Sequence, residues 1–210
     1  TSVVSTDWAF AALKGNGSVV TWGHSSYGGS SSTVSTALAS GVTSVFSNVY
    51  AFAALKGNGS VVTWGEGSIG GDSSAVAADL TDVQTIFSTE YAFAALKTDG
   101  SVVTWGRATH GSDSSVVRSQ LSRDVQRVAA TSAAFAALRA DGSVVTWGVP
   151  ATGGDSSAVR GHLANGVLKV AATRHAFAAL KADNLIVTWG NAYYGGAGYI
   201  LSTVDVSWRD

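Results

Sequence analysis

The sequence predicts an all-β protein, a β-propeller built from five blades of about 42 residues. The first observation behind this prediction is a repeat. The string Val-Thr-Trp-Gly recurs at intervals of 42, 41, 42 and 42 residues, with its tryptophans at Trp22, Trp64, Trp105, Trp147 and Trp189. The second observation is that every repeat contains several short strand-like segments and glycine-rich turns. Regular spacing of this size indicates a repeat architecture, and short strands in each repeat favour a propeller.

A β-hairpin is predicted at the centre of each repeat. In the first copy, residues 9–14 and 18–22 are rich in strand-forming side chains, and Asn16-Gly17 lies between them. Asn-Gly and Asp-Gly tolerate the positive φ angles of a tight hairpin turn. The second to fourth copies have one of these pairs at the same point. The fifth has Asp183-Asn184, in which asparagine can still adopt the left-handed conformation.

Two further elements complete the repeat. A third strand is expected before each hairpin, at residues 1–5, 43–47, 84–88, 126–130 and 168–172. After the hairpin, the string Asp-Ser-Ser-x-Val-x-x-x-Leu recurs at residues 72–80, 113–121 and 155–163. Aspartate is a good helix N-cap, and Val and Leu four residues apart share a helical face, so we expect a short helical turn. An outer strand is the alternative for this segment.

The repeats are expected to form a single domain over residues 1–210. Their approximate limits are 1–42, 43–83, 84–125, 126–167 and 168–210. We expect a closed five-bladed ring, monomeric when closed, and a part of a longer array is the alternative. A β-solenoid is less suitable, because its rungs are usually shorter and need no tight central hairpin. Residues 197–206 lack the Asp-Ser-Ser signature and alternate like a strand, as terminal repeats are often atypical.

Composition excludes several classes of function. The net charge is only -1, from 13 Lys and Arg against 14 Asp and Glu, and no basic run is present. Nucleic acids and anionic membrane surfaces bind clustered cations, so we expect neither as a partner. Without cysteine there is no disulfide or thiolate chemistry, and no apolar run approaches the roughly 18 residues of a membrane span. The compartment is not fixed by these features, although an extracellular or cell-surface location is favoured.

The repeat resembles that of the regulator of chromosome condensation family. Five copies of the string Ala-Ala-Leu-Lys-x-Asp/Asn-Gly-x-Val-x-Thr-Trp-Gly, with small variations, carry the resemblance through nearly the whole chain. The resemblance implies propeller blades, usually seven in that family. The repeat length is similar to that of a short-repeat branch, which includes the propeller-type β-lactamase inhibitory protein and repeat arrays of large exported microbial proteins. The name-giving members act on chromatin and a small GTPase through basic segments and acidic loops. Neither feature is recognisable here, so neither activity is implied.

Positions that stay the same in nearly every copy are expected to form the core. Phe10, Leu13, Val20 and Trp22, with their equivalents, are such positions. We expect the repeated tryptophan to pack blade against blade rather than to form an aromatic ligand box. Positions that differ between copies are expected to face outward.

Two sets of variable positions are the candidate binding residues. The first set immediately precedes each Ala-Phe pair and consists of Trp8, Tyr50, Tyr91, Ala133 and His175. In a propeller these residues lie in the turn between the first two strands of each blade, so they should open on one end of the ring. The second set precedes the Gly-Gly turn and consists of Tyr27, Ile69, His110, Thr152 and Tyr194. Exposed aromatic residues on one face are typical of protein or sugar interfaces. The alternative is that these loop positions vary without a binding function and that their rings are partly buried.

Two sets of charged residues have structural interpretations. A basic ring is expected at the hairpin turns, formed by Lys14, Lys56, Lys97, Arg139 and Lys181. Its simplest interpretation is five solvated charges without partners, and its functional interpretation is an anion-binding rim. The second set is Asp72, Asp113 and Asp155. These residues lack the dense acidic alternation of a calcium site, so helix capping explains them better.

These patterns predict a non-enzymatic binding scaffold. No Gly-x-Ser-x-Gly elbow, phosphate-binding Gly-x-x-x-x-Gly-Lys string or pair of carboxylates occurs in a suitable context. The four histidines fall at different phases of the repeat without metal-ligand spacing, so we expect no metal and no cofactor; they are His24, His110, His162 and His175. A protein partner gripped by the aromatic face is the preferred function. The alternatives are a structural or adhesive module of a larger exported protein, with carbohydrate as its ligand, and a consensus-like repeat protein without a ligand.

Overall fold

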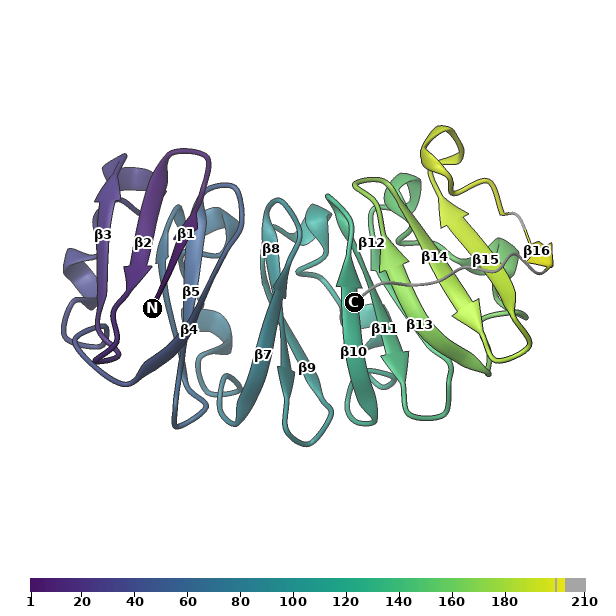
Figure 1. Cartoon of the computed structure of the whole chain (residues 1–210), viewed down its shortest axis with the longest axis horizontal. Helices are drawn as coiled ribbons and strands as arrows, with labels where there is room; N and C mark the ends of the chain where they lie inside the picture. Colours follow the sequence, from purple (N-terminus) through teal and green to yellow (C-terminus); the bar gives the residue numbers. More distant parts are fainter. Residues whose placement is uncertain (199, 203–210) are drawn as a thin grey trace.

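The computed structural model describes residues 1–198 and 200–202, and over these residues it is an all-β structure. It contains five antiparallel sheets, one for each repeat, in which consecutive strands of the chain are neighbours. The sheets, called blades 1 to 5 in chain order, lie side by side along an arc (Figure 1). The β-propeller blades predicted from the repeat are therefore confirmed.

Each blade has an inner, a middle and an outer strand, and the inner strands line the concave side of the arc, which faces the viewer in Figure 1. The inner strands are β1 (Ser2–Ser5), β4 (Val42–Ser47), β7 (Val83–Ser88), β10 (Val125–Ala130) and β13 (Val167–Ala172). The middle strands are β2 (Ala9–Leu13), β5 (Ala51–Lys56), β8 (Ala92–Lys97), β11 (Ala134–Arg139) and β14 (Ala176–Lys181). The outer strands are β3 (Val19–Gly23), β6 (Val61–Gly65), β9 (Val102–Gly106), β12 (Val144–Gly148) and β15 (Leu185–Gly190). The predicted third strand of each repeat is present and, in blades 2 to 5, begins one residue earlier than predicted.

The hairpin between middle and outer strands has the predicted turn. In blade 3, Phe93 of β8 pairs with Trp105 of β9, and Gly100 in the turn has a φ of 77°. In blade 5, Asn184 takes the corresponding place with a φ of 63°. The left-handed asparagine predicted there is confirmed.

Single turns of 3₁₀ helix lie in the loops that follow the outer strands. The first turn of each loop is η1 (Ser25–Tyr27), η3 (Gly67–Ile69), η5 (Ala108–His110), η7 (Pro150–Thr152) or η9 (Ala192–Tyr194). The second turn is η2 (Ser32–Val34), η4 (Ser74–Val76), η6 (Ser115–Val117) or η8 (Ser157–Val159). The predicted helical turn is thus confirmed at the length of one turn, and the outer-strand alternative is wrong for residues 72–80 and their equivalents. Within the described residues no helix is long and apolar enough to cross a bilayer.

The repeated aspartates hold the start of the second 3₁₀ turn. The carboxylate of Asp72 accepts the amide proton of Ser74, the first residue of η4, at 2.8 Å. This hydrogen bond holds the pKa of Asp72 below its usual range. Asp113 and Asp155 bond in the same way to the amides two residues further on. The aspartates thus act from one residue before the N-cap rather than as the N-cap itself.

Blade 5 has a fourth strand. β16 (Ile200–Ser202) pairs antiparallel with β15, and Ile200 stands opposite Val187. This strand falls within residues 197–206, which the sequence predicts to be strand-like. Residues 199 and 203–206 of that segment lie outside the described residues.

The hydrophobic core lies between the blades rather than inside them. Among the described residues, four clusters of buried side chains each join two consecutive blades. Between blades 3 and 4, for example, Phe135 and Trp147 of blade 4 pack on Ala94 and Leu96 of blade 3. The predicted phenylalanine and tryptophan positions are buried in blades 2 to 5. The repeated tryptophan therefore packs blade against blade, as predicted.

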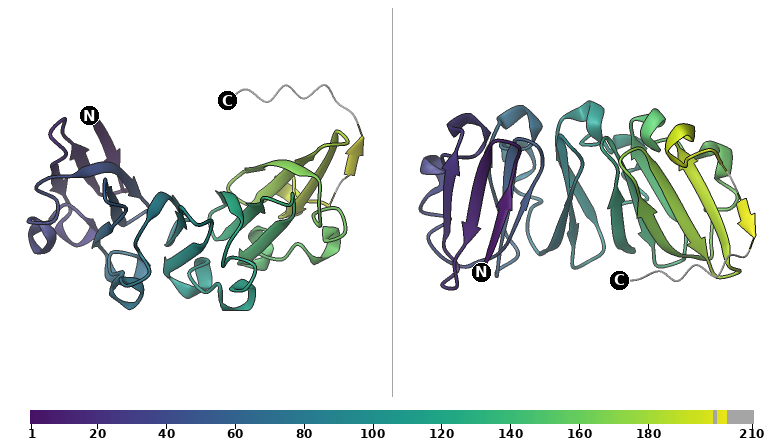
Figure 2. Two further views of the ribbon diagram at one scale, coloured as in Figure 1. Left: turned by 90° about the horizontal axis from the view of Figure 1, so that it is seen from below. Right: turned by 45° about the horizontal axis from the view of Figure 1, so that its top comes forward.

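Over the described residues the blades form an open arc, which corrects the expectation of a closed five-bladed ring. Among the described residues, extensive contacts between strands join the same or neighbouring blades, and blades 1 and 5 stand at opposite ends of the arc (Figure 2). Phe10 and Trp22 of blade 1 are 45% and 47% exposed, whereas their equivalents in blades 2 to 5 are at most 4% exposed. Each interface turns one blade relative to the last, and the four steps between five blades do not complete a circle.

Candidate functional site

A buried Thr or Asn begins the turn between the inner and middle strands in blades 1 to 4. In blade 4, the Thr131 hydroxyl accepts the amide proton of Ala134 at 3.1 Å and donates to the carbonyl of Thr152 at 3.0 Å. Thr152 ends η7, so this side chain ties the strand turn to the 3₁₀ turn of the same blade. The same bridge joins Thr6 to Tyr27, Asn48 to Ile69 and Thr89 to His110.

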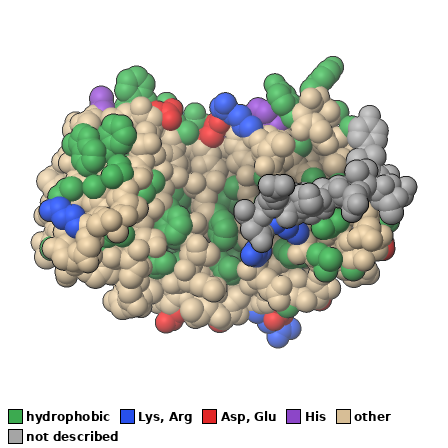
Figure 3. All heavy atoms as spheres, in the orientation of Figure 1, with side chains coloured by type: hydrophobic (Ala, Val, Ile, Leu, Met, Phe, Trp, Pro, Cys, Tyr) green, Lys and Arg blue, Asp and Glu red, His purple; other side chains and the backbone are tan. Residues whose placement is uncertain are grey.

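This bridge brings together the two sets of variable residues that the sequence predicts as binding residues. The ring centroids of Tyr27 and Tyr50 are 4.7 Å apart, those of Tyr50 and Tyr91 6.1 Å, and those of Tyr91 and His110 4.7 Å. Trp8 joins the row at 6.3 Å from Tyr27. We call the rings at this end of the blades the aromatic rim: Trp8, His24, Tyr27, Tyr50, Tyr91, His110, His175 and Tyr194. Hydrophobic and histidine side chains gather along this edge, at the top of Figure 3.

The aromatic rim has two parts, separated by blade 4. Blades 1 to 3 carry the continuous row, and His175 and Tyr194 of blade 5 form a separate pair with centroids 4.5 Å apart. Blade 4 has Ala133, which is 6% exposed, and Thr152 in place of rings. The structure thus places Trp8 and four more of the predicted binding residues in one row and leaves the other two as a pair. Trp8 and Tyr194 are exposed, and the remaining predicted rings are half-buried.

Charged groups lie beside the row. The guanidinium of Arg107 is 5.5 Å from the centroid of the Tyr91 ring, within the range of a cation–π contact. Glu90, the neighbour of Tyr91 in the chain, forms an ion pair with Arg174 of blade 5, and this pair reaches across blade 4. Burial, together with the charge of Arg107, holds the pKa of His110 below its usual range. The imidazole of His110 is therefore neutral at neutral pH.

Two features of the aromatic rim were not predicted. His24 stacks on Tyr27 with centroids 4.5 Å apart. It belongs to neither of the two sets of variable positions predicted from the sequence. The bridging Thr and Asn residues were also missed. Their signal is a hydroxyl or amide side chain three residues before every Ala-Phe pair.

The basic residues of the hairpin turns lie at the other end of the blades. The Lys56 ammonium donates to the carbonyl of Ala37 at 2.7 Å, and Lys181, only 8% exposed, donates to two loop carbonyls. Arg139 pairs with Asp124. The interpretation as solvated charges without partners is therefore wrong for these three residues, which hold the neighbouring loops.

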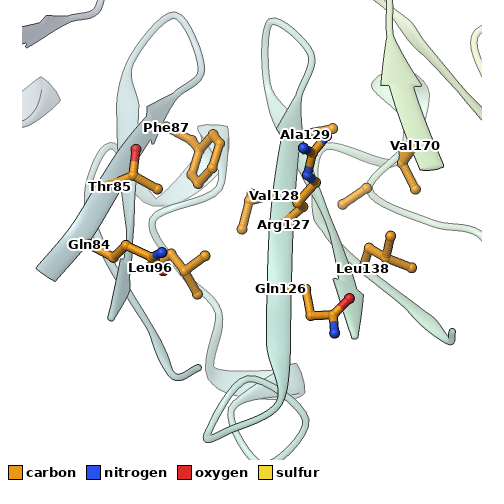
Figure 4. Close-up of a pocket in the computed structure, with 11 residues that line it drawn as sticks. Gln84, Thr85, Phe87, Leu96, Gln126, Arg127, Val128, Ala129, Leu138 and Val170 are labelled. Atoms are coloured by element: carbon orange, nitrogen blue, oxygen red, sulfur yellow. The ribbon is translucent and has the colours of Figure 1, made fainter. Parts of the chain in front are cut away.

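A groove on the concave side is a second candidate surface (Figure 4). It has a volume of about 490 Å³ and runs along the inner strands β7 and β10. Gln84, Gln126 and Arg127 supply its polar lining, and Phe87 and Leu96 are among its apolar residues. The groove contains none of the residues that the sequence predicts to bind a partner, so it is separate from the aromatic rim.

Solved structures with a similar fold include a receptor-kinase ectodomain, human WBSCR16 and yeast RCC1. The ectodomain of the Physcomitrella patens receptor kinase CR4 is similar at 15% identity and a TM-score of 0.51, over 91% of this chain and 50% of that one. Human WBSCR16 is similar at 17% identity and a TM-score of 0.52, over 90% of this chain and 61% of that one. Yeast RCC1 (Prp20), in its complex with Kap60, is similar at 17% identity and a TM-score of 0.50, over 90% of this chain and 55% of that one.

The chain spans between half and about three fifths of the length of these structures. At identities this low, the similarity shows the fold alone. No protein-family model and no curated protein matches the sequence. The resemblance indicated by the repeat string thus extends to the three-dimensional fold.

Proposed function

We propose that this chain is a non-enzymatic binding scaffold that grips a protein partner with the aromatic rim. The observation that carries the proposal is the row of neighbouring rings across blades 1 to 3. Aromatic residues and arginine are enriched in protein interfaces and supply much of the binding energy there. Trp8, which is 56% exposed, is the outermost anchor, and Arg107 with its cation–π contact to Tyr91 lies beside the row.

The packing of the rings favours a protein partner over a carbohydrate. An aromatic residue that binds a sugar presents a free face on which the sugar ring stacks. The planes of Tyr50 and Tyr91 are within 15° of parallel, and Tyr27 leans on Tyr50, so these faces are turned toward one another. The hydroxyl groups and ring edges remain for a partner, and they suit the polar groups of a peptide.

The unequal blades favour one partner over a multivalent array of small ligands. An adhesive module that binds carbohydrate in several blades needs equivalent pockets in those blades. Blade 4 has Ala133 where the other blades have rings, and blades 2 and 4 have Ile69 and Thr152 where the others have a second ring, so the aromatic rim is not equivalent from blade to blade. Yeast RCC1, which shares the fold, was crystallised bound to Kap60, and this supports a protein partner for a propeller of this kind.

A phage-displayed library of random linear peptides tests the proposal. The wild-type chain is expected to enrich a set of peptides, whose Kd is then measured by calorimetry. The double variant Trp8→Ala/Tyr91→Ala should bind these peptides roughly thirtyfold more weakly or worse, because truncating aromatic anchors costs about 2 kcal/mol or more. Trp22→Ala is the matched control, since Trp22 is a similarly exposed tryptophan outside the aromatic rim, and it should bind as the wild type does.

Two results would overturn the proposal. The first is a failure of the wild-type chain to enrich any peptide, combined with a glycan array that shows binding by a multimerised form of the chain. The second is enrichment of peptides whose affinity is unchanged in the double variant, provided that its thermal unfolding matches that of the wild type. That result would move the binding surface away from the aromatic rim.

A further inference from the structure

Every interface between blades uses the same two complementary parts. A phenylalanine of the following blade lies directly over the glycine that ends the first 3₁₀ turn of the preceding blade. A Cβ atom built on that glycine would come within 2.5–2.7 Å of the phenylalanine ring at Gly28, Gly70, Gly111 and Gly153. The tryptophan that stacks on this phenylalanine donates its indole N–H to the carbonyl of the same glycine, at 2.9–3.1 Å.

A row of backbone hydrogen bonds accompanies these contacts. The amide of Asp7 donates to the carbonyl of Val49 at 3.0 Å, and the amide of Val49 to that of Glu90 at 3.2 Å. The row continues from Glu90 to Ser132 and from Ser132 to Arg174. Each turn between inner and middle strands is thereby bonded to the same turn of the next blade.

Blade 1 carries one half of this interface, and in the part of the chain that the structure describes no blade packs on it. Its Phe10 and Trp22 rings are stacked with centroids 5.3 Å apart, against 5.1–5.3 Å in the other blades. The pair is therefore already arranged for packing, yet both rings are about half exposed, and Val20 beside them is 41% exposed. We call this surface, formed by Phe10, Val20 and Trp22, the head face. Among the described residues, nothing accepts a hydrogen bond from the Trp22 indole.

Blade 5 carries the other half. A Cβ atom on Gly195 would meet nothing within 4 Å, whereas its equivalents are covered by phenylalanine. Ala178 and Leu180 are half-buried, although the equivalent Ala94 and Leu96 are 0% and 3% exposed. We call this surface, formed by Ala178, Leu180 and Gly195, the tail face. Over the part of the chain that the structure describes, the row of backbone hydrogen bonds also ends here, at Arg174.

We propose that the head face of one copy of this chain docks on the tail face of a second copy and repeats the interface found between its own blades. The tail face, on the same chain, is complementary to the head face. Because the two faces lie at opposite ends of the arc (Figure 2), they can meet only between two molecules. In the docked pair, the Trp22 indole donates to the carbonyl of Gly195, and the Arg174 amide donates to the carbonyl of Asp7. Both groups thereby gain the partners that their equivalents have.

The contact is head to tail rather than two-fold symmetric. Head-to-tail contacts close into rings where the rotation permits and otherwise build open chains. The association should therefore depend on concentration and should need one intact head face and one intact tail face. This requirement separates the proposal from general adhesion of exposed apolar side chains.

Sedimentation velocity across micromolar to millimolar concentrations tests the proposal with three variants. Phe10→Ala/Trp22→Ala removes the head face, and Ala178→Arg places a charged side chain in the tail face. Both changes fall on surfaces that are exposed or half-exposed in the single chain, so thermal unfolding of the dilute proteins should match the wild type. Val116→Ser is the control, because Val116 is 92% exposed and lies on neither face.

The wild type and Val116→Ser are expected to associate. Each single-ended variant alone should associate roughly thirtyfold more weakly or not at all. An equal mixture of the two single-ended variants should form a dimer that does not grow further, because one supplies an intact tail and the other an intact head. A wild type that stays monomeric throughout, or a mixture that stays monomeric while the wild type associates, would overturn the proposal. Peptide binding at the aromatic rim should be unchanged in both variants, so this test and the test of the proposed function fail independently.

Discussion

A single residue type has a different environment in this chain depending on whether a blade precedes it. Trp105 donates its indole N–H to the carbonyl of Gly70 at 3.1 Å and is 4% exposed. Trp22 occupies the same place in the repeat, within the same local string, and is 47% exposed. The difference arises from the preceding blade rather than from the local sequence. The contribution of the interblade contact can therefore be measured by making one substitution at two places.

Trp105→Phe should destabilise the fold, and Trp22→Phe should not. The first substitution removes the donor for a buried carbonyl and leaves a small gap, which together cost about 1–3 kcal/mol. Trp22→Phe changes a ring that, among the described residues, makes no hydrogen bond to another blade. Urea unfolding of both variants, followed by circular dichroism, gives the two changes in the free energy of unfolding. Equal losses would show that the tryptophan stabilises its own blade and that the interblade bond contributes little.

The elements that define each interface are the outer strand and the 3₁₀ turn that follows it. Gly111 and Gly195 both end such turns, with φ angles of 102° and 95°. Any L-residue is strained at these angles. A Cβ atom on Gly111 would in addition lie 2.7 Å from the Phe135 ring, whereas one on Gly195 would meet nothing within 4 Å.

Gly111→Ala should therefore cost more stability than Gly195→Ala. The backbone strain is common to both variants and cancels in the comparison. The remaining difference is the overpacking against Phe135, for which about 1–3 kcal/mol is typical. Thermal unfolding of the dilute proteins measures it. Equal losses of stability in the two variants would mean that Gly111 is required for its backbone angle alone. The Phe135 ring would then be able to move aside for the added methyl group.

Elements were predicted from the sequence more completely than the surfaces they form. The hairpins, the inner strands and the left-handed Asn184 each follow from local patterns of side chains and turn residues, and the structure confirms them. The aromatic rim was predicted as two separate sets. What joins them is the hydroxyl of Thr131 and its equivalents, which bridges two loops that are about twenty residues apart in the sequence. A hydroxyl or amide side chain recurs at this position in every repeat, but the recurrence does not reveal which loop the side chain reaches.

For the whole molecule, the closed ring was the expectation that the structure corrects. Closure depends on the angle between consecutive blades accumulated over the whole chain, and hydrophobic periodicity within a repeat carries no information about that angle. The result is an open arc in which each blade contacts its sequence neighbours. The stability of such an array is approximately the sum of the intrinsic stabilities of its repeats and of the interfaces between neighbours. Among the described residues, blades 1 and 5 each have one interface and the central blades have two.

Native-state hydrogen exchange should reveal this gradient. The amides of β2 should exchange roughly tenfold or more faster than those of β8, because blade 1 can detach by breaking one interface whereas blade 3 is held by two. The strands have closely matched sequences and the same pairing within their blades, so local propensity does not account for a difference. Uniform exchange in dilute solution would instead mean that the blades unfold as one cooperative unit, and the additive description of the array would be wrong.

Hydrogen exchange measured at several protein concentrations distinguishes the single arc from the docked pair. If the head face of one copy covers the tail face of another, raising the protein concentration should slow exchange in β2 and in β14 and β15 while leaving β8 unchanged. The Phe10→Ala/Trp22→Ala variant, which lacks the head face, should show fast exchange in β2 at every concentration. Slower exchange in β8 alone, or in all strands equally, would place the contact between copies elsewhere on the arc, because over the described residues the uncovered interface faces belong to the two end blades.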